Sequence, residues 1–266
     1  MLMLTHTYLL QKVFGASDVK KDDLDIYVYN IVPDLLTIHP QISSAQTHKI
    51  KRNLNIPACY SRASYVMFHL LVDDLAHYGY ICPDCKEEFD PDSQGYSYVK
   101  GKPLINSIFE LYNNTIGKEI SYNDAAYSSH LIIEMIFDLV ILTHMNSIKT
   151  VDLLAEAINF TAKNKMDEFS ATINWLYDLG GNEVKEVMKE ASFYITKERM
   201  ERIMNIDGRI RLYTNKFGLK TGDKVLYDGI KKLFLQARDL LDADDELFLF
   251  ESAQTIKNYG WVPPLT

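Results

Sequence analysis

Apolar side chains recur at helical spacing through most of this chain, and residues 55–79 show the pattern most clearly. Asn55 is placed to cap a helix and Pro57 suits its first turn, after which apolar positions repeat every three or four residues. Gly79 ends the repeat, as glycine commonly does just beyond a helix. The pattern predicts one long helix over this segment.

A second helix is predicted from about residue 122 to residue 145, where apolar side chains fill most positions. Ser121 and Asp124 stand at the spacing of a capping box at its start. Between the two helices, residues 81–101 combine glycine, proline and aspartate and predict a long loop. Within that loop, residues 95–101 admit a short strand pair around their tyrosines and valine.

From residue 150 onward the periodicity stays helical, and no motif that carries chemistry stands out. Helices are predicted at residues 150–164, 166–179, 182–192, 196–206, 223–242 and 244–257. The chain is therefore expected to be all-α. Residues 1–145 are expected to form the main domain, with an inserted loop at 81–120. Residues 146–266 would be a helical extension packed on it, which need not be a separate domain.

The composition is that of an ordinary globular protein, since 47% of the 266 residues are hydrophobic and 24% are charged. The longest apolar run, residues 131–142, is interrupted by Glu134 and Asp138 and falls short of the roughly 18 residues that cross a bilayer. The first residues lack the basic region of a secretory signal. We therefore expect a cytoplasmic protein without a transmembrane segment, and three cysteines fit a reducing compartment.

The formal net charge of −8 argues against strong non-specific binding to nucleic acid, because such binding needs a basic surface. The Cys82-x-x-Cys85 pair has no second cysteine pair, so it is only a weak indication of a structural zinc site. Neither feature decides the oligomeric state of the chain.

The histidines carry the chemical signal. His69, Asp73 and His77 stand at i, i+4 and i+8 in the first predicted helix, and each four-residue step turns only about 40° around the helix axis. The three side chains therefore form one stripe. In the second helix, His130 and Glu134 are also four residues apart, between neighbours that are nearly all apolar.

A single pair of this kind is usually a hydrogen-bonded core or surface pair. Two such pairs on the two most apolar helices are harder to explain in that way, because a buried unpaired charge costs several kcal/mol. A shared divalent metal ion would satisfy both helices, since imidazole and carboxylate are the ligands that Zn²⁺ prefers. We therefore predict that residues 1–145 form a metal-binding domain. Three upstream residues gain weight as members of the same set: His6, Asp34 after Pro33, and His48.

The order of these residues resembles that of the zinc-dependent phospholipase C family, whose fold is shared by the single-strand-specific zinc nucleases. The resemblance rests on motifs over about residues 1–145, above all His69-Leu-x-x-Asp73-x-x-x-His77 and His130-x-x-x-Glu134. It implies a multi-helix, metal-centred domain of the phospholipase C and nuclease type.

The resemblance also implies a ligand set and an activity. One zinc would be held by Asp34, His48, His69 and Asp73, a second by His77, His130 and Glu134, and a third by His6, the bridging Asp73 and the amino-terminal residue. Secreted members present a processed tryptophan at that terminus where this chain has Met1, so two or three Zn²⁺ ions are expected. Asp34 would be a ligand and also the catalytic group that orients or deprotonates the attacking water.

The expected function is hydrolysis of a phosphodiester or phosphomonoester, on a phospholipid headgroup or a nucleotide. Two other helical metal proteins are excluded by inspection. No histidine here is followed by the aspartate of an HD phosphohydrolase, and none has the glutamate three residues earlier that ferritin-like di-iron sites use. The alternative is a non-catalytic helical interaction protein whose metal site is structural, with a closed ligand shell.

Overall fold

A computed structural model describes residues 1–14, 19–84, 89–144, 148–220, 222–241 and 245–264, and no strand occurs in these ranges. The first half contains eight α-helices: α1 Met3–Phe14, α2 Asp25–Asn30, α3 Val32–Leu36, α4 Ser44–His48, α5 Ala63–His77, α6 Tyr96–Gly101, α7 Ile105–Leu111 and α8 Tyr122–His144. The second half contains seven: α9 Ile148–Asn164, α10 Met166–Tyr177, α11 Gly181–Tyr194, α12 Lys197–Ile203, α13 Ile206–Lys216, α14 Lys224–Leu241 and α15 Asp245–Asn258. The prediction of an all-α protein is confirmed.

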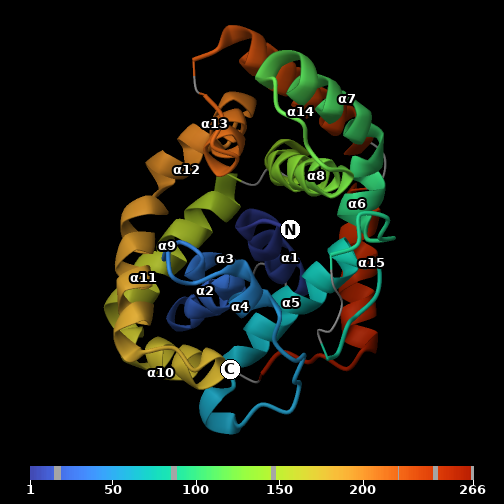
Figure 1. The fold of residues 1–266 in the computed structure, drawn as a ribbon. Coiled ribbons are helices and arrows are strands. Elements are labelled where there is room, and N and C mark those ends of the chain that lie inside the picture. Colours follow the sequence, from blue (N-terminus) through green and yellow to red (C-terminus); the bar gives the residue numbers. More distant parts are fainter. Residues whose placement is uncertain (15–18, 85–88, 145–147, 221, 242–244, 265–266) are drawn as a thin grey trace.

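Helices of the second half flank the central helices of the first on two sides. Figure 1 shows α9 to α12 curving along one side and α14 and α15 along the other, with α1, α5 and α8 between them. Buried apolar side chains from both halves form one continuous core, in which Leu4 of α1, Phe68 of α5 and Phe137 of α8 are all inaccessible to solvent. The amino-terminal end of α1 therefore lies deep inside the molecule.

One segment, Tyr122–Leu142 of α8, is long and apolar enough to cross a membrane by length and composition alone. In the structure 83% of its 18-residue window is buried by the rest of the protein, as expected for the central helix of a globular core.

Most of the predicted helices are present with shifted ends. The capping box at Ser121 and Asp124 forms, and α8 begins at Tyr122 as expected. The prediction of a helix from residue 55 is wrong at its start, because α5 begins only at Ala63 and is preceded by a short 3₁₀ turn at Ala58–Tyr60. Helix α13 was not predicted.

The strand pair considered at residues 95–101 is also wrong, because Tyr96–Gly101 forms α6. Two glycines explain how α6 fits between α5 and α8. A Cβ on Gly95 would lie 2.1 Å from the carbonyl carbon of His77, and a Cβ on Gly101 would lie 2.8 Å from Ser129 Oγ. Only a residue without a side chain allows such close approaches, so both ends of α6 are pressed against the two helices that carry the histidine motifs.

A buried polar network fixes α1 against α8 and α13. Asp138 Oδ1 accepts hydrogen bonds from the backbone amide of Thr5 at 3.0 Å and from its hydroxyl at 2.7 Å, and Asp138 Oδ2 accepts one from Arg209 Nη2 at 2.9 Å. All three residues are buried. Because Thr5 precedes His6, this network sets the position of the first candidate ligand.

Candidate metal centre

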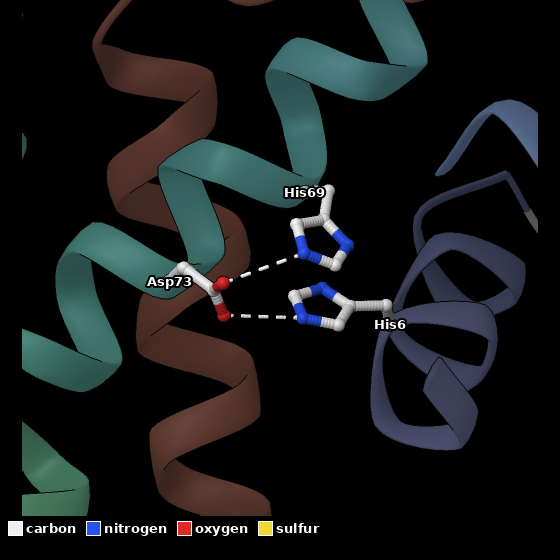
Figure 2. A group of neighbouring side chains, drawn as sticks. All are labelled: His6, His69 and Asp73. Atoms are coloured by element: carbon white, nitrogen blue, oxygen red, sulfur yellow. Dashed lines mark ion pairs between the residues drawn. The ribbon is translucent and has the colours of Figure 1, made fainter. Parts of the chain in front are cut away.

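Asp73 is the centre of the cluster of histidines and carboxylates. Its Oδ1 lies 3.2 Å from His6 Nε2, and its Oδ2 lies 3.3 Å from His69 Nε2 and 3.4 Å from His48 Nε2. Figure 2 shows the two oxygens directed at two different imidazoles, that of His69 on the same helix and that of His6 on α1. The carboxylate is thus oriented as a group that could bridge two metal sites.

The distances among these atoms are those of a shared coordination shell. With Zn–N and Zn–O bonds of about 2.0–2.2 Å, two ligand atoms of a tetrahedral zinc lie roughly 3.3–3.5 Å apart. The separations around Asp73 are 3.2–3.4 Å, and His48 Nε2 lies 3.5 Å from Asp34 Oδ1. The facing nitrogens of His6 and His69 are buried and make no hydrogen bond, although each is near a carboxylate oxygen. Both facts fit a metal ion better than direct hydrogen bonds.

A second group lies between the end of α5 and α8. His77 Nε2 is 2.8 Å from Glu134 Oε1, and His130 stands one helical turn before Glu134 on α8. One ligand atom from each of the three residues can be chosen so that all lie within 4.8 Å of one another. The Nδ1 atom of His130 is buried without a hydrogen-bond partner.

The amine of Met1 lies between the two groups. It is 2.6 Å from Asp73 Oδ1 and 3.2 Å from Glu134 Oε1, and Met1 is buried. Burial alone would lower the pKa of this amine, but the carboxylates of Asp73 and Glu134 outweigh burial and raise its pKa to about 11. A buried primary amine is therefore one of the groups facing the bridging carboxylate.

Two imidazoles and two carboxylates of the cluster have the protonation states that metal ligands need. Burial lowers the pKa of His69 to about 4 and that of His130 to about 4, so both imidazoles are neutral at pH 7, as a metal ligand must be. Burial opposes ionisation of Asp73, but the Met1 amine and His69 hold its pKa well below the usual range. The pKa of Glu134 is likewise lowered by the amine and His77, despite burial.

Asp34 and His48 are less deeply buried than the other residues around Asp73. Burial raises the pKa of Asp34, but His48 and His69 outweigh it, so the net pKa is lowered and the carboxylate is ionised at neutral pH. Burial lowers the pKa of His48, whereas the neighbouring Asp34 and Asp73 raise it by more. His48 ends α4, which begins with a complete capping box between Ser43 and Gln46.

One buried asparagine contacts two of the candidate ligands, through its backbone carbonyl and its side-chain amide. The carbonyl oxygen of Asn30, at the end of α2, lies 2.7 Å from His69 Nδ1, and its side-chain amide donates to the carbonyl of His6 at 2.8 Å. A hydrogen on His69 Nδ1 would be donated to this carbonyl, leaving the Nε2 lone pair directed at Asp73. No spacing in the sequence distinguishes Asn30 from other polar residues.

A buried ion pair holds the chain that carries His48. Arg52 donates from Nε and Nη2 to the two oxygens of Asp74 at 3.0 and 2.6 Å, and from Nη1 to the carbonyl of His48 at 2.8 Å. The backbone amide of Cys82 also donates to Asp74, at 3.0 Å. Asp74 thus helps to hold the segments that contain Arg52 and Cys82 beside α5, whereas Asp73, the preceding residue in the sequence, faces the imidazoles.

A pocket of about 320 Å³ opens on both groups and is lined by Asp34, His48, Asp73, His77, His130 and Glu134, among others. Aromatic rings form one wall: Tyr98 stacks on His130 with ring centroids 4.6 Å apart, and Phe89 and Tyr127 lie beside it. Tyr96 instead packs against Phe248 of α15, so of the two tyrosines of α6 only Tyr98 lines the pocket.

The eight residues predicted as ligands come from five helices and fall into groups that could hold a metal ion, and six of them line this pocket, whereas His6 and His69 are fully buried. They are His6 of α1, Asp34 of α3, His48 of α4, His69, Asp73 and His77 of α5, and His130 and Glu134 of α8. They form three sets: His6 with His69 and Asp73, Asp34 with His48 and His69, and His77 with His130 and Glu134. The last set is the one expected from the sequence, whereas the first two share His69 where the expected sets share Asp73. These groups could hold metal ions. Cys85 lies outside the described residues.

Comparisons with protein-family models, with curated proteins and with solved structures find no match to this chain. The function is therefore inferred from the side chains of the site and not from a relative.

Proposed function

We propose that this protein is a zinc-dependent phosphoesterase whose two or three ions are held by the eight side chains around Asp73. The observation that carries this proposal is the bridging arrangement of Asp73, whose two oxygens face different imidazoles beneath an open pocket. A structural zinc site is normally closed by four protein ligands, whereas a catalytic site keeps a position open to solvent. The multi-helix fold of the phospholipase C and nuclease type is part of the same proposal.

Zinc bound in these groups would acidify a water molecule and offset the negative charge that develops on phosphoryl oxygens. Asp34 would hold that water in line with the phosphorus atom and accept its proton. It is suited to this role because it lines the pocket, is ionised at neutral pH, and has one buried oxygen without a hydrogen-bond partner. Asn30 and Arg52 would act through His69 and His48 as positioning residues.

The pocket wall fits an ester with one anionic and one apolar or aromatic part. Lys49 and Lys216 line the pocket and would favour phosphoryl oxygens, and Tyr98 and Tyr127 offer ring faces beside His130. A phospholipid headgroup ester and a nucleotide ester both satisfy this description. We therefore specify only the phosphoester bond, and the assay identifies the leaving group.

The direct test combines metal analysis with turnover. Protein expressed with added zinc should carry two or three metal equivalents by elemental analysis. It should hydrolyse bis(p-nitrophenyl) phosphate or p-nitrophenyl phosphate, and a chelator should abolish this activity. Protein that binds two or more equivalents but turns over neither ester, nor a phospholipid nor a dinucleotide, would support the structural alternative. Protein that binds none would refute both.

Two matched pairs of variants separate the roles. Asp34→Asn should lower kcat by about 10²–10⁴-fold with a smaller change in metal content, whereas Asp90→Asn, in the same pocket but outside the metal groups, should leave both unchanged. His69→Ala should lower metal content, and His39→Ala should not, because His39 lies beside Glu186 outside these groups. Equal losses of metal and activity in Asp34→Asn would make Asp34 an ordinary ligand.

A further inference from the structure

A second cavity, larger than the metal pocket, lies between α1, α5, α15 and the chain that follows α15. Its volume is about 840 Å³, within the range of roughly 300–1,000 Å³ that is typical of small-molecule sites. The two cavities share no lining residue. We call this second cavity the α1/α15 groove.

The floor of the α1/α15 groove is apolar and belongs to the core. Leu9, Phe68, Leu249 and Trp261 line it and are each no more than 5% exposed. Trp261 is fixed in place, because its indole nitrogen donates to the carbonyl of Ser64 at 2.9 Å and its ring packs on Phe68. An occupant would therefore meet a preformed apolar surface.

The mouth of the groove is different. Large apolar side chains stand exposed there, with Phe250 63% and Val262 71% accessible. Two exposed lysines, Lys12 of α1 and Lys257 of α15, line the same opening, and Glu246 is the one carboxylate among the lining residues. On a chain whose net charge is −8, this opening has a local excess of positive charge.

We propose that the α1/α15 groove binds a single-chain anionic amphiphile, with the acyl chain on the apolar floor and the carboxylate or phosphate head between Lys12 and Lys257. The volume accommodates one small molecule, and the charge at the mouth complements an anionic head. An apolar chain would also cover Phe250 and Val262, whose exposure otherwise costs free energy. This proposal does not depend on the phosphoesterase activity.

The fluorescence of Trp261 can report binding in the groove. It has two tryptophans, and Trp175 lies on α10 against Tyr60, away from the groove. In a Trp175→Phe variant, Trp261 is the only tryptophan, so 9,10-dibromostearate bound in the groove should quench its fluorescence in a saturable way. Stearate should reverse the quenching by competition. Oleoyl lysophosphatidate and oleate, as competitors, distinguish a phosphate head from a carboxylate head.

Two variants in the same background locate the occupant. Ala253 is a half-buried residue in the lining of the groove. Ala253→Phe narrows the groove and should weaken binding of dibromostearate at least tenfold. Reversal of both mouth lysines, Lys12→Glu with Lys257→Glu, should weaken it about tenfold and leave binding of the uncharged oleyl alcohol unchanged. Lys224→Glu, an exposed lysine on α14 outside the groove, is the matched control and should have no effect.

Three results would overturn the proposal. The first is no saturable quenching by monomeric dibromostearate. The second is quenching that Ala253→Phe leaves unchanged, although the variant melts like its parent, since the quencher would then bind elsewhere. The third is association with vesicles of anionic phospholipid without binding of the monomeric amphiphile, which would identify the opening as a membrane-contact surface.

Discussion

The close approach of Gly95 to α5 can be tested by adding a single methyl group. In Gly95→Ala the new Cβ would lie 2.1 Å from the carbonyl carbon of His77 and 2.3 Å from its oxygen, where an ordinary contact is 3.4–4 Å. These are backbone atoms of the last residue of α5, and unlike the end of a side chain they cannot rotate away. The segment that carries α6 must therefore move away from α5 by more than about 1 Å.

The expected cost is that of overpacking, about 1–3 kcal/mol. For a domain of this size, each kcal/mol lowers the melting temperature by roughly 2–4 °C, so Gly95→Ala should melt about 2–12 °C below the parent. The displacement should also draw Ser97 Oγ away from Glu134, which it now approaches to 3.2 Å, and disturb the ring of Tyr98 on His130. Metal content should then fall as well.

Gly180→Ala is the matched control. Gly180 also precedes a helix as its N-cap, with φ −65° and ψ 143° against φ −62° and ψ 144° for Gly95. The three atoms nearest to a Cβ there all belong to the carboxylate end of the Glu183 side chain, which can rotate away. Each variant replaces an N-cap glycine of the same backbone conformation by alanine. The difference between their melting temperatures therefore isolates the contact with His77. Calorimetry on chelator-treated protein removes the contribution of metal, and melting temperatures within 1 °C of each other would refute the reasoning.

Three further predictions concern the buried polar groups. Arg52→Met leaves Asp74 without its positively charged partner and should cost about 3–5 kcal/mol of unfolding free energy in urea; a loss below about 1 kcal/mol would contradict a buried pair. Arg209→Met should cost a similar amount by stranding Asp138, and hydrogen exchange should show faster opening of α1. A chelator should lower the melting temperature of the metal-loaded parent, because metal binding contributes to folding free energy, and an unchanged melting curve would argue against a metal centre.

Periodicity predicted the parts of the site that lie on long helices. The stripe of His69, Asp73 and His77 follows from the helical repeat alone, as does the pair on α8. The repeat failed where one helix begins, because residues 55–62 have helical-looking apolar spacing but form an extended stretch and a short 3₁₀ turn. Local spacing carries no information about the tertiary contacts that decide such boundaries.

The elements that were missed have a shared cause. Helix α13 is mostly polar, and its buried arginine is stabilised by Asp138, 71 residues away in the sequence. The segment 95–101 alternates like a strand, but its two glycines serve close helix contacts that only the folded neighbours reveal. Asn30 reaches the cluster through the same long-range packing. Sequence patterns find residues that share an element, whereas these residues are brought together by different elements.

The energetics of the cluster give the strongest physical reason to expect a ligand there. Among the described residues, both ring nitrogens of His6 and one nitrogen each of His69 and His130 are buried without a hydrogen bond. Each such group costs about 1–3 kcal/mol, which is a large share of the 5–15 kcal/mol that stabilises a typical protein. An apolar core built for stability alone would place leucine or valine at these positions. Because Asp73 is held ionised and both His69 and His130 are neutral at pH 7, a divalent cation would satisfy these buried carboxylate and imidazole groups at the same time.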